Sequence, residues 1–184
     1  MGNIRLVENL LSENIQWNVR YKSLKILEKY LSYEDVFHHF DVDTIGSLLS
    51  DSSSNIREYS LEILLKFYKN KKIQKDQLLC ILYENINESS FLIRKRIVTT
   101  LADLFKNEED QNIEHFKSVN FVFLNKIGDS SESMKIKNII FDYYYDIFNT
   151  SRKTELASYT IDILVKIMDD NLLCDSIEQL FMVR

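Results

Sequence analysis

The chain has 184 residues, of which 45% are hydrophobic and 28% are charged, so it can bury a continuous core beneath a hydrated surface. It contains no proline and only three glycines, too few for the turns of a β-sandwich or for glycine-rich nucleotide-binding loops. A net charge of −5 gives no overall attraction to nucleic acid, and the apolar runs are too short to span a membrane. The composition predicts helices joined by short polar turns.

An internal repeat begins in the first predicted hairpin. Shifting the chain by 37 residues aligns 18–30 (NVRYKSLKILEKY) with 55–67 (NIREYSLEILLKF), with seven identities over 18–29, and further copies follow at 92–105 and 135–148. Four, seven, ten and eleven positions after a shared basic residue, every copy is apolar, which is the spacing of one helix face. On this face we expect four equivalent side chains to be buried: Leu27, Leu64, Leu101 and Tyr144.

A second amphipathic segment and a short polar turn precede these helices. Examples are 42–51, 75–86 and 115–127, and the serines and acidic residues of the turns suit helix capping. Each pair makes a helical hairpin that buries its apolar face only by stacking on its neighbours. The sequence therefore predicts an all-α, HEAT-type α-solenoid of four to five hairpins, with at least eight helices and no sheet. We place the hairpins at about 1–33, 40–70, 73–107, 111–150 and 154–184, as one array within a longer solenoid.

An acidic or amide residue is followed, five and six positions later, by an aliphatic and a basic residue. The triplets are Asn14–Val19–Arg20, Asp51–Ile56–Arg57 and Glu88–Ile93–Arg94. This spacing, in a period near 40, resembles the HEAT repeat. The resemblance implies an ion-pair ladder in which each acid meets the basic residue of the following repeat, with these members: Arg20, Asp51, Arg57, Glu88 and Arg94.

The fourth unit departs from this spacing. Asp129 is followed at the expected positions by Met134 and Lys135, whereas the apolar register fits Ile136 and Lys137. We interpret the difference as a two-residue insertion in the turn, where the ladder can break.

Residues 42–184 further resemble one part of the Nipped-B (kollerin) family, the HEAT-repeat subunit of the cohesin loader. Three segments carry the resemblance in the family's order: SDSSSNIREYSLEILLKFYKNKK, FLIRKRIVTTLADLF and SMKIKNIIFDYYYDIF, followed by the tail IDILVKIMDD…DSIEQLF. The chain lacks the family's proline after Asp51 and has Ile147-Phe148 in place of its Trp-Phe. The resemblance implies a nuclear, non-catalytic protein. Such a protein joins a loader partner subunit and the cohesin SMC–kleisin subunits, promotes cohesin loading onto chromatin DNA and sister chromatid cohesion, and stimulates the cohesin ATPase.

Two basic clusters are candidate contacts to the DNA backbone. Lys71 and Lys72 close one repeat, and Lys95 and Arg96 open the second helix of the next. Basic residues at helix ends also complement the helix dipole or simply face solvent, and both interpretations remain open. Arg94 is assigned to the ladder.

Catalytic and metal-binding patterns are weak. His38 and His39 beside Asp41 point to different faces of a helix, so we assign them to structure or surface, and no metal site is predicted. The run 143–145 (YYY) suggests base stacking, but packing is the better interpretation. Cys80 and Cys174 are expected to be buried, reduced thiols.

We therefore expect no enzyme activity and no cofactor. Two alternatives to the cohesin-loader function remain: a HEAT scaffold in nuclear transport, vesicle coats or phosphatase assembly, and a solenoid carrying a grafted catalytic site.

Overall fold

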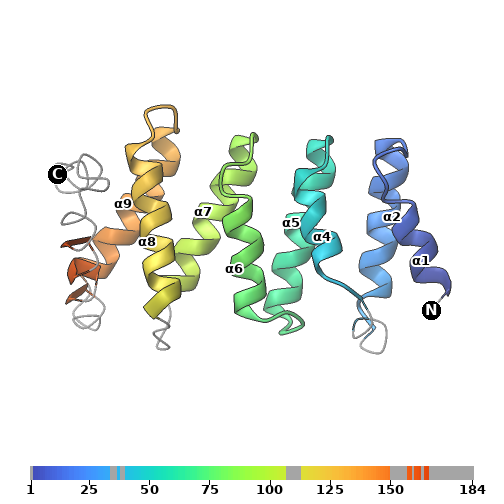
Figure 1. Cartoon of the computed structure of the whole chain (residues 1–184), viewed down its shortest axis with the longest axis horizontal. Helices are drawn as coiled ribbons and strands as arrows, with labels where there is room; N and C mark the ends of the chain where they lie inside the picture. Colours follow the sequence, from blue (N-terminus) through green and yellow to red (C-terminus); the bar gives the residue numbers. More distant parts are fainter. Residues whose placement is uncertain are drawn as a thin grey trace. The chain divides into compact units, whose positions relative to one another are not determined.

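The structure is a computed structural model. It describes residues 2–33, 37, 40–106, 113–149, 157–158, 160–162 and 164–165. Every regular element in this part of the chain is a helix, which confirms the prediction of at least eight helices and no sheet for the described residues. The elements, shown in Figure 1, are α1 (Gly2–Asn9), α2 (Trp17–Tyr30), α4 (Asp43–Ser47), the 3-10 helix η1 (Leu48–Ser50), α5 (Ser54–Lys69), α6 (Lys75–Glu84), α7 (Phe91–Lys106), α8 (Ile113–Gly128) and α9 (Met134–Asn149).

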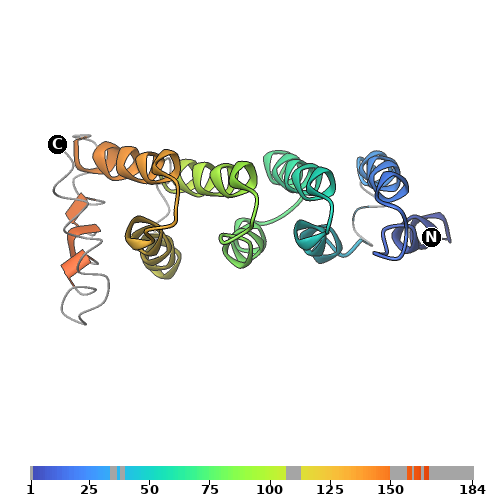
Figure 2. The same ribbon diagram turned by 90° about the horizontal axis from the view of Figure 1, so that it is seen from above.

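The helices fall into two compact units, Met1–Ile93 and Arg94–Arg184. In the first unit, α2 and α5 lie side by side in one layer, with α1, α4 and α6 in the other (Figure 2). In the second unit, α7 and α9 form one layer and α8 belongs to the other (Figure 2). Each unit thus has the two-layer arrangement of stacked helical hairpins.

The apolar stripe predicted from the repeat forms the core. Leu27, Leu64 and Leu101 are fully buried and Tyr144 is 1% exposed, which confirms their predicted burial. In the second unit the ring of Tyr143 also packs against Phe123, with ring centroids 5.0 Å apart. Tyr143 and Tyr144 are therefore core residues.

The helices of the first unit come into close contact at Gly46. A Cβ atom at this position would lie 3.3 Å from the Cδ1 and Cγ1 atoms of Ile81, a residue of α6. The absence of a side chain lets the short helix α4 approach α6 at this point.

One expectation is wrong, and others lie outside the described residues. Cys80 is exposed, so its predicted burial is wrong: it lies on the solvent side of α6, whose inner face carries Leu78, Leu79 and Leu82. Cys174, His38, His39 and most of the fifth predicted hairpin lie outside the described residues.

Candidate functional site

The ladder begins with a buried ion pair between α2 and the turn before α5. An Arg20 Nη2 atom lies 2.7 Å from Oδ1 of Asp51, and the two side chains are only 4% and 1% exposed. Arg20 also donates to the carbonyl oxygens of Glu13 and Ile15. These added hydrogen bonds offset the cost of removing the guanidinium from water.

The second pair repeats this arrangement one hairpin further along. Arg57 Nε lies 3.1 Å from Oε1 of Glu88, with side chains 14% and 8% exposed. Arg57 Nη1 also donates to the carbonyl oxygens of Asp51 at 2.8 Å and Ser52 at 3.2 Å. The turn between η1 and α5 is therefore held by arginines from two successive repeats.

The third pair, in the second unit, is a three-member cluster. Arg94 binds Glu132 through two hydrogen bonds of 3.1 Å, from Nε to Oε2 and from Nη2 to Oε1. Lys126 donates to Oε2 of the same carboxylate at 3.1 Å. Burial by itself raises the pKa of Glu132. Hydrogen bonds from Arg94, the Ser133 N–H and Lys126 lower the pKa by more than burial raises it, so the pKa lies below the ordinary value of 4.5.

Sequence reasoning missed Glu132 and Lys126. The insertion in the fourth unit does not break the ladder, because Glu132 occupies the position that the spacing gave to Asp129. Asp129 is exposed and instead accepts hydrogen bonds from the N–H and hydroxyl of Ser131. Glu132 immediately precedes the serine before α9, and this position is the signal that could have identified it.

The direction of the ladder also differs from the expectation. Each arginine pairs with the acid of the hairpin that follows it, as Arg20 does with Asp51. The HEAT resemblance implied the opposite, that each acid pairs with the basic residue of the hairpin that follows the acid. The reason is geometric: the turn before α5 lies against the start of α2, and the turn before α9 lies against the start of α7.

The ladder carboxylates also start helices. Asp51, Glu88 and Glu132 accept the backbone N–H of a serine next to the following helix, at 2.7, 2.8 and 2.9 Å. These serines are Ser53, Ser90 and Ser133. A carboxylate at a helix N-terminus satisfies a free N–H and favours the helix dipole, so one side chain both caps a helix and joins two repeats.

A further polar group joins α2 to α5. The Glu28 carboxylate accepts hydrogen bonds from Tyr59 Oη and, at 2.6 Å, from Lys66 Nζ. Burial raises the pKa of Glu28, but these two donors and the nearby Lys25 outweigh that effect and lower it. Lys25 Nζ lies over the rings of Tyr21 and Tyr59, 4.6 and 5.6 Å from their centroids.

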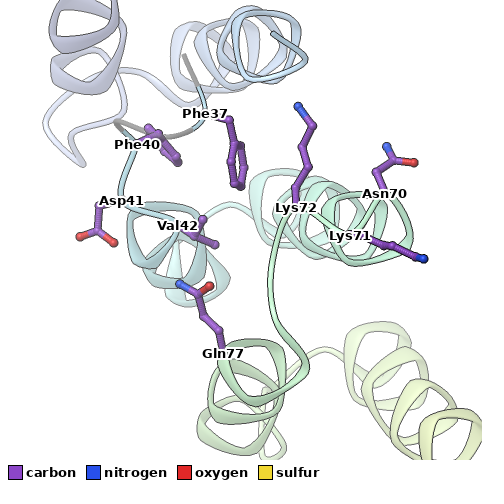
Figure 3. A pocket seen from close by; sticks show the side chains of 8 residues that line it. All are labelled: Phe37, Phe40, Asp41, Val42, Asn70, Lys71, Lys72 and Gln77. Carbon is purple, nitrogen blue, oxygen red and sulfur yellow. The ribbon is translucent and has the colours of Figure 1, made fainter. Parts of the chain in front are cut away.

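The candidate residues Lys71 and Lys72 border a pocket of about 350 Å³ in the first unit (Figure 3). Lys72 Nζ donates to the carbonyl oxygens of Leu31 at 2.7 Å and Ser32 at 3.0 Å, and lies 5.1 Å from the ring centroid of Phe37. Lys72 thus complements the C-terminus of α2. Lys71 is exposed and extends away from Val42 (Figure 3).

The other candidates, Lys95 and Arg96, are exposed in the first turns of α7. The adjoining Arg94 is bound to Glu132, just before α9. This pair brings the start of α7 close to the start of α9, where Lys135 is also exposed. Lys95, Arg96 and Lys135 are thus exposed near the starts of two helices that this ion pair joins.

Two further kinds of site were considered in the described part of the chain, a metal centre and a membrane-spanning helix. No group of three or more His, Cys, Asp or Glu side chains there is placed to hold a metal ion. None of the described helices is long and apolar enough to cross a membrane.

The fold has a counterpart among solved structures. A C-terminal fragment of the cohesin loader SCC2 from Chaetomium thermophilum superposes with a TM-score of 0.72 at 16% sequence identity. The likeness shows a HEAT-type α-solenoid. It spans 96% of this chain and 13% of the loader fragment, so the chain corresponds to a small part of that protein. No family model matches the sequence, and no curated protein matches it either.

Proposed function

We propose that this HEAT-type solenoid is a non-catalytic scaffold of the cohesin-loader type, which binds SMC–kleisin subunits and promotes their loading onto chromatin DNA in the nucleus. The fold likeness to a cohesin loader over 96% of the chain carries the proposal. The ordered resemblance of three sequence segments to the same family supports it independently.

The architecture suits a scaffold. Its buried polar groups join neighbouring repeats, as Arg20 does with Asp51 and Arg57 with Glu88. Stacked hairpins of this kind present extended surfaces to partners.

We place the DNA-backbone contact at the edge of the second unit formed by Lys95, Arg96 and Lys135. These side chains are exposed, whereas Lys72 of the other candidate cluster is occupied by two carbonyl oxygens. Lys71 is exposed and would add a separate, weaker contact.

Affinity purification of the tagged chain from nuclear extract, followed by mass spectrometry, tests the proposal. We expect the SMC and kleisin subunits of cohesin among the captured proteins, and direct binding when the purified SMC–kleisin complex is used alone. Capture of nuclear-transport, coat or phosphatase subunits, with no binding to the purified cohesin complex, would instead support the general HEAT scaffold. A Leu64→Ala variant is the control for binding that requires the folded array, because Leu64 is fully buried.

A further inference from the structure

In the layer that contains α2 and α5, the repeat shows what covers one side of a helix. In α5, Tyr59 and Lys66 bind Glu28 of α2, so this side of α5 faces the preceding helix. Beside them, Ile56 and Ile63 are fully buried and Phe67 is 2% exposed. An apolar stripe flanked by these two donors therefore packs against the preceding hairpin.

In α2 the equivalent stripe is uncovered. Val19, Ile26 and Tyr30, each 37 positions before its counterpart in α5, are 38%, 47% and 37% exposed. They lie on one side of the helix, whereas Tyr21 and Glu28 on the opposite side contact α5. We call this surface, with Lys22 and Lys29, the outer face of α2.

The polar groups beside the stripe indicate the charge of its partner. Lys22 and Lys29 align with Tyr59 and Lys66, the two residues that hold the Glu28 carboxylate. Both lysines are exposed and have no ion pair within the described part of the chain. A partner carboxylate that takes the position against α2 which Glu28 takes against α5 would lie within reach of both lysines.

This charge disfavours self-association through the same surface. Two copies of the chain joined by their outer faces would bring Lys22 and Lys29 of one copy against those of the other, and like charges across an interface are repulsive. An acidic partner has the opposite electrostatics.

We propose that the outer face of α2 docks an amphipathic helix of a partner protein, with an apolar stripe set over Ile26 and a carboxylate held by Lys22 and Lys29. The docking mode is the helix-on-helix packing that α2 itself makes with α5. This inference is independent of the proposed role in cohesin loading.

The test uses the whole chain and two synthetic, hydrocarbon-stapled helical peptides that share a leucine stripe. One peptide carries glutamates along the edge of the stripe and the other carries lysines at the same positions. Binding is measured by fluorescence anisotropy of the labelled peptide, with the fluorescence of Trp17, the single tryptophan, as a second signal from the first turn of α2. We expect the acidic peptide to bind at least about tenfold more tightly than the basic one.

Three variants locate the binding. Ile26→Glu should lower the affinity of the acidic peptide by about tenfold or more, because the substitution places a charge in the apolar stripe. The Lys22→Glu/Lys29→Glu double variant should reverse the preference, so that the basic peptide binds better. Tyr145→Glu is the matched control, since Tyr145 is 66% exposed on α9, and it should leave both affinities unchanged.

Equal affinity for the two peptides, or a preference that the double variant does not reverse, would overturn the proposal. So would a dimer in sedimentation velocity that Ile26→Glu dissociates, because a second copy of the chain would then occupy the face. Circular dichroism of each variant excludes unfolding as the cause, and all four substituted positions are exposed.

Discussion

Lys71 has a φ of 57°, in the left-handed region that a residue with a side chain rarely adopts. It follows the C-cap of α5, where its N–H donates to the Tyr68 carbonyl and the Lys72 N–H donates to the Phe67 carbonyl, both at 2.9 Å. This is the Schellman arrangement, whose left-handed position glycine usually fills.

Replacing Lys71 with glycine should therefore stabilise the chain. We expect Lys71→Gly to raise the free energy of unfolding by about 0.5–1 kcal/mol, because glycine pays no Cβ penalty in this conformation. Urea denaturation followed by circular dichroism measures the change. Lys69→Gly, two residues earlier at the end of the helix, should lower the free energy of unfolding, and the same sign for both variants would contradict the argument.

Glu132 forms ion pairs with two cations, Arg94 and Lys126. Glu132→Gln leaves Arg94 and Lys126 without their buried counter-charge, and we expect it to cost about 3 kcal/mol of stability at neutral pH. Denaturation midpoints of the two proteins measure this cost. The exposed substitution Glu58→Gln is the control and should have little effect.

The cost of Glu132→Gln should depend on pH. Because the folded-state pKa of Glu132 lies below 4.5, its ionised form contributes stability fully above that value, and the contribution is lost as the pH falls through the folded-state pKa. The stability difference between wild type and Glu132→Gln should therefore narrow on acidification below pH 4.5. A constant difference down to pH 3 would show that the carboxylate charge is not responsible.

At the scale of the helix, Leu64 tests the core stripe. Leu64 lies in α5 and is fully buried, so Leu64→Ala should destabilise the chain by about 2–5 kcal/mol. The matched control is Glu62→Ala, at an exposed position of the same helix. A loss below about 1 kcal/mol for Leu64→Ala would mean that the stripe is not the core of the first unit.

The repeat also explains which elements could be predicted. Helices 18–30, 55–67, 92–105 and 135–148 share a period of apolar positions, and burial of Leu27, Leu64 and their equivalents follows from that period. The predicted burial of Cys80 is wrong because the residues around it are apolar on every side, so their pattern does not show which side of the helix faces solvent. Periodicity identifies the buried face only where polar residues mark the opposite one.

The polar contacts were less predictable, because they depend on how turns lie in space. The residues of the pairs Arg20–Asp51 and Arg57–Glu88 were identified, but the partner and direction of each pair require the three-dimensional position of the turn. Glu132 and Lys126 converge through a turn of altered length, which no fixed spacing represents. The hydrogen bonds from Lys72 to the carbonyl oxygens of Leu31 and Ser32 likewise cannot be predicted from the sequence.

For the whole molecule, the net charge of −5 sets the expectation for nucleic acid: binding must be local and sensitive to salt. If Lys95, Arg96 and Lys135 contact phosphates, the slope of log affinity against log salt should be about −3 for duplex DNA. Fluorescence anisotropy of labelled DNA between about 50 and 200 mM salt measures the slope.

Charge reversal identifies the contacts. Lys95→Glu/Arg96→Glu should remove most of the DNA affinity, and reversal of Lys71 and Lys72 as well should abolish it. Lys71→Glu alone, which leaves the hydrogen bonds of Lys72 intact, should have a smaller effect than the first double variant. DNA binding that is unchanged by reversal of all four, or absent from the parent at low salt, would leave the chain as a protein scaffold only.

The shifted carboxylate in the last ladder pair has a consequence for the comparison of sequences. Glu132 stands five positions before Lys137, whereas Asp51 and Glu88 stand six before Arg57 and Arg94, yet Glu132 still joins the two helices it serves. A turn that can lengthen while another side chain takes over its contact tolerates insertions and deletions without loss of the stack. Two arrays of this kind can therefore share a three-dimensional architecture although the lengths of their turns, and hence their sequence spacings, differ.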